Sequence, residues 1–182
     1  FILKGYAGTG KTSIISALVN SLPKFNKRSV LLAPTGRAAK VITSYSGRNA
    51  LTIHKKIYRK KNAASLEMEF SLAENMHENT LFIVDEASMI SHEGHTMFSD
   101  GLLHDLIKFV QSGKNCTLML VGDVAQLPPV GLQTSPALDI EFMNTEFGLH
   151  IFTYELTEVV RQGKNSGILF NATKIRDDIR LD

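Results

Sequence analysis

Near its start the chain reads Gly5-Tyr6-Ala7-Gly8-Thr9-Gly10-Lys11-Thr12, which matches the pattern GxxxxGKT. An apolar run, Phe1 to Leu3, comes before this stretch, and apolar residues at helical spacing, from Ile14 to Leu22, come after it. This order is typical of a strand, a glycine-rich loop and a helix that starts at the loop. Glycines let backbone N–H groups turn inward around phosphate oxygens, and the helix start adds positive potential. The stretch therefore predicts a phosphate-binding loop in an α/β fold.

The chemistry of this loop predicts ATP and Mg²⁺ as cofactors. The Lys11 side chain is long enough to reach the β and γ phosphates, and the Thr12 hydroxyl is suited to contact Mg²⁺. We therefore assign to nucleotide binding Gly5, Ala7, Gly8, Thr9, Gly10, Lys11, Thr12 and Ser13. The alternative is a glycine-rich turn before a helix, with Thr9 as the helix cap.

Apolar runs of β type alternate with helical patterns along the chain. The runs are Phe1 to Leu3, Val30 to Ala33, Leu81 to Val84, Thr117 to Val121 and Ile151 to Leu156. We expect a hairpin or surface insertion between Lys60 and Asn79. We expect a helix from Gly10 to Leu22, a second that begins after Gly36 and has Ala38 and Tyr45 on its apolar face, and two more from Met97 to Val110 and from Ile168 to Ile179. The alternation predicts one α/β domain over residues 1–182, with a parallel sheet that helices cover on both faces.

A second chemical signal follows the apolar run that ends at Val84. The next residues are Asp85 and Glu86, which places two carboxylates at the carboxyl edge of the predicted sheet, where ligands of such folds bind. Asp85 is suited to hold the hydration shell of Mg²⁺, and Glu86 is suited to accept a proton from an attacking water. A solvated turn or a helix cap is the alternative. Together with the phosphate loop, the pair indicates nucleotide hydrolysis.

Composition restricts the remaining possibilities. The 20 basic and 18 acidic residues give a formal charge of +2, so only a local cluster of cations would indicate a polyanionic partner. Cys116 is the single cysteine and lies in a run that predicts a buried strand, which argues against a disulfide framework and a thiolate metal site. No apolar stretch reaches the ~18 residues of a membrane span. We expect a cytoplasmic protein with no membrane partner.

Four further segments accompany the phosphate loop and the acidic pair. They are Leu31-Leu32-Ala33-Pro34-Thr35-Gly36-Arg37-Ala38-Ala39-Lys40, Thr52-Ile53-His54, Val121-Gly122-Asp123-Val124-Ala125-Gln126-Leu127-Pro128-Pro129-Val130-Gly131 and Leu156-Thr157-Glu158-Val159-Val160-Arg161-Gln162. In this order they resemble motif Ia, the short motif after it, motif III and motif IV of superfamily 1 DNA helicases of the RecD and Pif1 type. The pattern GDxxQLPPV is the most diagnostic, because phosphate loops occur in many ATPases. The chain resembles lobe 1A, the first RecA-like P-loop NTPase lobe of such a helicase.

The resemblance implies roles that the residue patterns alone do not assign. Gln126 would sense the γ phosphate, and Arg161 would touch it from the end of the lobe and stabilise developing charge. A second RecA-like lobe, outside these 182 residues, would supply the remaining motifs and half of the track for single-stranded DNA. Taken alone, Gln126 also fits a polar turn and Arg161 a surface ion pair. With Lys11 and Glu86 they form the predicted catalytic set.

Two segments are candidates for contact with nucleic acid. One candidate segment consists of Pro34, Thr35, Gly36 and Arg37. It offers a hydroxyl, backbone N–H groups at a helix start and a guanidinium, which suit the phosphates of a single strand. The resemblance adds His54. Residues 54–61 form the densest basic stretch, in which a base can stack on Tyr58. The alternative is an amphipathic helix with Ile53 and Ile57 buried and its lysines in solvent.

Two other functions agree with parts of this pattern. One is a P-loop ATPase of another class, which would need a substrate lid or base-specific loop and would have no use for the segments around Thr35 and Gln126. The other is a lobe that binds nucleotide or a protein partner without turnover. We expect the helicase lobe, which binds and hydrolyses ATP, because the residue types that hydrolysis requires are all present.

Overall fold

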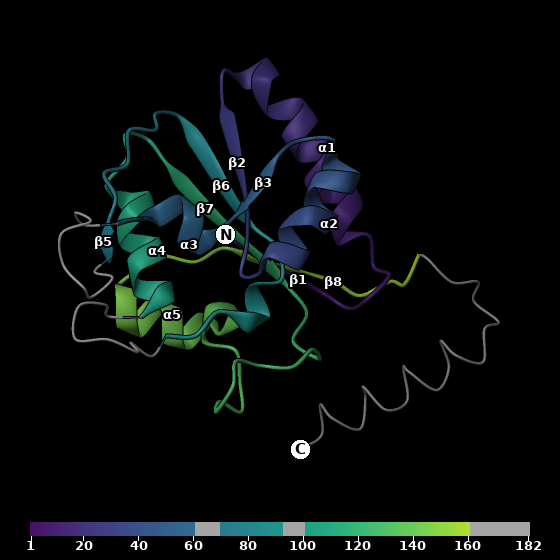
Figure 1. Cartoon of the computed structure of the whole chain (residues 1–182). Helices are drawn as coiled ribbons and strands as arrows, with labels where there is room; N and C mark the ends of the chain where they lie inside the picture. Colours follow the sequence, from purple (N-terminus) through teal and green to yellow (C-terminus); the bar gives the residue numbers. More distant parts are fainter. Residues whose placement is uncertain (61–69, 93–100, 161–182) are drawn as a thin grey trace.

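The computed structural model describes residues 1–60, 70–92 and 101–160 (Figure 1). Its centre is a sheet of six parallel strands in the order β3-β2-β6-β7-β1-β8. The strands are β1 (Ile2–Gly5), β2 (Arg28–Ala33), β3 (Ala50–Thr52), β6 (Thr80–Val84), β7 (Thr117–Gly122) and β8 (Thr153–Leu156). The first strand therefore lies inside the sheet, between the two last ones. The predicted parallel sheet is confirmed.

Helices cover both faces of this sheet, as predicted (Figure 1). One face carries α1 (Lys11–Ser21) and α2 (Gly36–Ser46), and the other carries α3 (Ile53–Ile57), α4 (Leu102–Gln111) and α5 (Ile140–Phe147). Short 3₁₀ helices connect these elements: η1 (Leu22–Phe25), η2 (Ala87–Met89) and η3 (Pro136–Leu138). In the part of the chain that the structure describes, no helix is long and apolar enough to cross a membrane.

Alternating side chains of the strands build two apolar cores. Phe82 and Leu120 point toward α4 and α5, whereas Ile83 and Val121 point toward α1 and α2, where Ile15 meets them. All five side chains are buried. Because both faces are covered, the central strands are apolar along their length instead of alternating with polar residues, which is why they were recognisable in the sequence.

A small second sheet borders the segment between Lys60 and Asn79, for which the sequence predicts a hairpin or surface insertion. Of the alternating residues on which that prediction rests, Leu66 and Met68 lie outside the described residues. β4 (Tyr58–Lys60) pairs antiparallel with β5 (Phe70–Leu72), and Lys60 lies opposite Phe70. The carbonyl of Ile57 also accepts a hydrogen bond from the N–H of Ala73 at 2.7 Å, which ties the far end of this hairpin to α3.

Some elements of the structure differ from the sequence predictions. The third helix begins at Leu102 and not at Met97, because Gly101 has φ 112° and ψ 153°, which no helix accommodates. The sequence did not predict α5, which Asp139 caps by accepting a hydrogen bond from the N–H of Phe142 at 3.0 Å. Cys116 is half-buried and precedes β7, so it is not part of a buried strand. The last predicted helix, residues 168–179, lies outside the described residues.

Gly122, at the end of β7, has no room for a side chain. A Cβ atom there would lie 2.7 Å from Cδ1 of Leu138 and 3.3 Å from the backbone nitrogen of Ser88. Leu138 is itself buried, so an added methyl group must displace η3. We expect Gly122→Ala to lower the free energy of unfolding by about 1–3 kcal/mol in a urea titration. Gly36→Ala is the control, because nothing lies within 4 Å of that position, and an equal loss in both variants would contradict the steric explanation.

Candidate functional site

The carboxyl ends of the parallel strands form one edge of the sheet, and the residues singled out in the sequence lie along it. Because parallel strands run in the same direction at spacings of about 4.8 Å, the segments that follow neighbouring strands lie next to one another. In sheet order, this edge carries His54 after β3, Thr35 after β2, Asp85 after β6, Gln126 after β7, the phosphate loop after β1 and Val160 after β8. The fold thus brings together segments that are far apart in the sequence.

The loop between β1 and α1 turns tightly through two glycines. Gly8 has φ 83° and Gly10 has φ 92°, in the left-handed region that glycine adopts at little cost. Between them Thr9 is buried, and the carbonyl of Tyr6 accepts both its N–H at 3.2 Å and its hydroxyl at 2.8 Å. The Thr9 hydroxyl therefore closes the loop on itself. It does not cap α1, whose N-cap is Gly10, so the alternative of a Thr9-capped turn is wrong.

Lys11 is the first residue of α1, and its side chain bends back over the loop. Its Nζ donates to the carbonyl oxygens of Gly5 at 2.6 Å and Tyr6 at 3.0 Å. An ammonium group has three N–H donors, so these contacts leave one for a phosphate oxygen. Thr12 and Ser13 follow in the exposed first turn of the helix. The arrangement has the donors that a polyphosphate requires at a helix start.

The acidic pair lies in a turn between β6 and η2. One carboxylate oxygen of Asp85, Oδ1, accepts the N–H of Glu86 at 2.9 Å, and the other, Oδ2, accepts the hydroxyl of Tyr45 at 2.8 Å. Both acidic residues are half-buried. Glu86 has φ 56°, an uncommon backbone conformation for a residue with a side chain, and such strained positions concentrate at functional sites.

Glu86 belongs to a cluster of interacting charges. Burial raises the pKa of its carboxyl group, the charge of Asp85 raises it further, Lys11 opposes the increase and Asp123 adds to it. Asp123 is buried at the end of β7, next to β6 in the sheet. A carboxylate whose pKa is raised above its ordinary value is better suited to accept a proton than an ordinary surface glutamate.

Gln126 lies in the loop that follows β7. Two hydrogen bonds shape this loop, because the side chain of Asp123 accepts the N–H of Ala125 at 2.9 Å and its carbonyl accepts the N–H of Gln126 at 3.2 Å. The Gln126 side chain is exposed and, with Lys4, lines a hollow of about 300 Å³ at this edge. The turn geometry agrees with the polar-turn alternative, and contact with a γ phosphate stays a prediction.

The segment after β8 returns to the phosphate loop. The N–H of Val160 donates to the carbonyl of Gly8 at 2.9 Å, and Cγ2 of Val160 lies 3.9 Å from the position that a Cβ atom would take on Gly10. Arg161 is the next residue along the chain and lies outside the described residues. Its predicted role is therefore untested, although the residue before it contacts the loop.

The candidates for nucleic-acid contact lie at the ends of β2 and β3, which pair in the sheet. Thr35 caps α2, because its Oγ1 accepts the N–H of Ala38 at 3.2 Å. Gly36 and Arg37 follow in the exposed first turn of this helix, and His54 is exposed in the first turn of α3. Pro34, Thr35, Gly36, Arg37 and His54 thus occupy neighbouring positions at the edge, and their contact with nucleic acid stays a prediction.

The basic stretch after His54 agrees in part with the alternative of an amphipathic helix. The two isoleucines of α3 are fully buried, as that alternative requires. The hydroxyl of Tyr58 donates to Asp105 at 2.5 Å, and Nζ of Lys56 lies 2.6 Å from Nε2 of His77. Tyr58 and Lys56 are therefore engaged in contacts within the protein.

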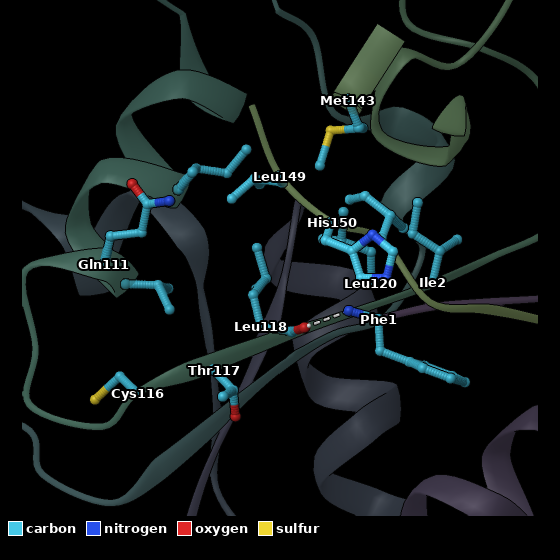
Figure 2. A pocket seen from close by; sticks show the side chains of 13 residues that line it. Phe1, Ile2, Gln111, Cys116, Thr117, Leu118, Leu120, Met143, Leu149 and His150 are labelled. Atoms are coloured by element: carbon cyan, nitrogen blue, oxygen red, sulfur yellow. Dashed lines mark hydrogen bonds between the residues drawn. The ribbon is translucent and has the colours of Figure 1, made fainter. Parts of the chain in front are cut away.

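An apolar cavity of about 260 Å³ lies at the opposite edge of the sheet (Figure 2). The amino ends of β1 and β7, the helices α4 and α5, and the segment before β8 line it. There the amino group of Phe1 donates to the carbonyl of Leu118 at 3.0 Å, with Met143 above them (Figure 2). Because the phosphate loop follows the carboxyl end of β1, this cavity is separate from the candidate site.

A parallel sheet with a glycine-rich loop after its first strand and an acidic pair after a nearby strand defines a P-loop nucleotide-binding lobe. The family model of an AAA domain matches residues 1–180, and the chain belongs to this family. Nucleotide binding is the property that this P-loop domain implies.

The relatives of this chain include DNA helicases. The ATP-dependent RecD2 DNA helicase of Deinococcus radiodurans is 30% identical over 169 residues, which are 92% of this chain and 20% of that protein. The ATP-dependent DNA helicase dda of Enterobacteria phage T4 is 28% identical over 178 residues, 96% of this chain and 37% of the helicase. The chain is thus an AAA-type ATPase lobe related to superfamily 1 DNA helicases, and it spans well under half the length of these two relatives.

A solved structure confirms the RecA-like fold. The crystal structure of Bacteroides sp Pif1 in complex with ADP-AlF4 matches with a TM-score of 0.54 at 21% identity. The match covers 95% of this chain and 41% of the Pif1 chain.

Sequence reasoning gave no role to two residues that the structure places at the site. Asp123 acts on the charge of Glu86, and its position directly after an apolar strand was a usable signal. Tyr45 contacts Asp85, yet in the sequence it only continues the apolar face of a helix. The two residues are 40 positions apart, so no local pattern in the sequence indicates their contact.

The raised pKa of Glu86 predicts how stability depends on pH. Above this pKa the ionised carboxylate is disfavoured in the folded protein, and the penalty disappears as pH falls below the ordinary value of 4.5. Glu86→Gln removes the charge and keeps the size, so we expect a higher unfolding temperature than the parent near pH 7 and a smaller difference near pH 4. Differential scanning calorimetry measures both, with the exposed Glu74→Gln as control. A lower unfolding temperature for Glu86→Gln at neutral pH would contradict the raised pKa.

Proposed function

We propose that this chain is the ATP-binding and ATP-hydrolysing motor lobe of a DNA helicase or translocase that acts on single-stranded DNA. The observation that carries the proposal is the order of segments along the carboxyl edge of the sheet. The phosphate loop, Gln126 and the acidic pair follow adjacent strands, and Thr35 and His54 follow the next two. A nucleotide and a DNA strand would then contact one continuous edge. The relatives that are named ATP-dependent DNA helicases support the same assignment.

The residues of the loop fit Mg²⁺ and ATP. A Cβ atom on Gly5 would lie 2.6 Å from Oγ1 of Thr9 and 3.0 Å from Cβ of Leu156, so the backbone turns where only glycine fits. In the proposal, the phosphates are held by Gly5, Ala7, Gly8, Thr9, Gly10, Lys11, Thr12 and Ser13. The Thr12 hydroxyl and the Asp85 carboxylate supply oxygen donors of the kind that Mg²⁺ prefers. Bound Mg²⁺ would neutralise charge on the phosphates.

Four residues would carry the hydrolysis step. Lys11 would contact the β and γ phosphates through its remaining N–H, and Glu86 would orient the attacking water and take its proton. Gln126 would contact the γ phosphate from the neighbouring strand. Arg161 would stabilise the charge that develops during transfer, and the contact of Val160 with Gly8 supports this placement.

The other half of the edge would bind single-stranded DNA. Pro34, Thr35, Gly36, Arg37 and His54 form its contact set in the proposal. The first turn of α2 offers backbone N–H groups and the Arg37 guanidinium to phosphates, and neither is specific for a base. This chemistry agrees with a motor that moves along a strand of any sequence.

A second lobe is the partner that best explains the loop after β7. Leu127 is 85% exposed and Val130 102% exposed, so two large apolar side chains of one loop face solvent at the edge that carries the candidate site. Contact with a second RecA-like lobe would bury them. A P-loop ATPase of another class gives this loop no role. A lobe without turnover does not need the charge cluster around Glu86.

Lys11→Ala tests the nucleotide site. The parent chain is expected to bind Mg·ADP, and the variant is expected to bind at least about 10-fold more weakly, because charge-assisted hydrogen bonds contribute about 1.5–3 kcal/mol. Isothermal titration calorimetry gives both affinities. Lys24→Ala, which removes an exposed lysine of η1, serves as the control and should keep the parent affinity. Equal binding by Lys11→Ala and the parent would remove Lys11 from the site.

Arg37→Ala tests the DNA-binding edge. Binding of a fluorescent oligonucleotide to the parent should weaken as salt rises, because cations of the protein replace counterions on the phosphates. Loss of one such contact should reduce the slope of log affinity against log salt by about 0.7. Fluorescence anisotropy measures the slope, and Lys24→Ala should leave it unchanged. Salt-independent binding, or an unchanged slope in Arg37→Ala, would count against DNA at this edge.

A further inference from the structure

We infer that Tyr45 is a positioning residue for the metal site: its hydroxyl holds the Asp85 carboxylate in the orientation that Mg²⁺ requires. The inference rests on the proposed function, since it concerns the same nucleotide site. It adds a residue from α2, an element that none of the nucleotide-binding patterns in the sequence includes.

Three hydrogen bonds fix Asp85. The Tyr45 hydroxyl donates to Oδ2 at 2.8 Å, the N–H of Glu86 donates to Oδ1 at 2.9 Å, and the N–H of Asp85 itself donates to the carbonyl of Leu32 at 3.1 Å. The last two are backbone contacts, one within the turn after β6 and one from that turn to β2. Tyr45 comes from α2 and provides the one side-chain contact of the three. It binds Oδ2, whereas the backbone contact from Glu86 binds Oδ1.

The surroundings of Tyr45 suit this role. Its ring packs against the apolar core under α1 and α2, while its hydroxyl reaches past the core to the acidic pair. A phenol hydroxyl carries one O–H donor, and here that donor is directed at the carboxylate. Each carboxylate oxygen has further lone pairs, so the bond from Tyr45 still leaves Asp85 able to accept from metal-bound water.

The same helix links Asp85 to the proposed DNA-binding edge. Tyr45 lies in the last turn of α2, and Thr35 and Arg37 lie at its start. One helix of 11 residues therefore carries both the proposed DNA contacts and the hydroxyl that holds Asp85.

Tyr45→Phe removes the hydroxyl and keeps the ring that packs in the core. The affinity for ADP is measured by calorimetry over a range of Mg²⁺ concentrations and again with the metal chelated. Mutation of a residue that orients a metal ligand typically lowers metal affinity about 10–100-fold. We therefore expect that Tyr45→Phe needs about 10-fold more Mg²⁺ than the parent to reach half of the Mg²⁺-dependent increase in ADP affinity. Without Mg²⁺, the two proteins should bind ADP equally, because the phosphate loop is untouched.

Tyr58→Phe is the matched control. It breaks another bond from a tyrosine hydroxyl to an aspartate, Asp105, in the hairpin and α4 region. Its Mg²⁺ requirement should equal that of the parent.

Tyrosine fluorescence supplies a second readout that does not depend on turnover. The chain has four tyrosines and no tryptophan, so the emission comes from tyrosine alone. Adding Mg²⁺ to the parent with ADP should change the emission as the partner of the Tyr45 hydroxyl engages the metal. The change should be smaller in Tyr45→Phe, in which Tyr6 of the phosphate loop still emits, and retained in Tyr58→Phe.

Two results would overturn the inference. One is an Mg²⁺ requirement in Tyr45→Phe equal to that of the parent. The other is an equal weakening of ADP binding with and without Mg²⁺, which would show that Tyr45 supports the loop and not the metal ligand. Failure of the parent to bind Mg·ADP would instead overturn the proposed function, and the inference with it.

Discussion

Parallel pairing of β1 with two strands from the far end of the chain is the constraint on which the rest of the structure depends. With β7 on one side and β8 on the other, β1 delivers the phosphate loop to the same edge as the carboxylates that follow β6 and β7. Parallel neighbours must be joined by crossovers, and the crossover helices cover both faces. The same pairing therefore explains the two cores, the apolar strands and the gathering of polar side chains at one edge.

The site itself works against stability. Asp85, Glu86 and Asp123 are at least half-buried, and the charges of Asp85 and Asp123 disfavour an ionised Glu86 while Lys11 favours it. Glu86 also occupies a left-handed backbone position. Such an arrangement persists only because the surrounding sheet is buried on both faces and holds the strand ends in place. A bound cation would relieve the repulsion, which agrees with the proposed Mg²⁺ at this cluster.

The sequence predicted those parts of the molecule that local patterns encode. The phosphate loop was clear because its glycines and Lys11 stand at fixed spacing between an apolar run and a helical pattern. The strand before Asp85 was clear because an apolar run ends directly at two carboxylates. α5 was missed because its start depends on a cap at Asp139 and its packing on distant residues, and α4 was predicted too long because Gly101 was read as helical. The bond from Tyr45 to Asp85 was invisible, since tertiary packing alone creates it. The roles of the site residues remain predictions.

The pairing of β1 with β8 also imposes an order on folding. Ile2 pairs with Thr153 and Gly5 with Leu156, so β1 leaves the ribosome long before this partner and can pair with it only after β8 has been synthesised. Contacts so distant in sequence form slowly, because the intervening chain must close a long loop. Leu156 is also the side chain that packs on Gly5 at the entrance to the phosphate loop. A nascent chain that ends before β8 already contains Lys11, Asp85 and Glu86 but lacks the Leu156 side chain. The phosphate loop therefore completes its packing only after β8 has been added to the sheet.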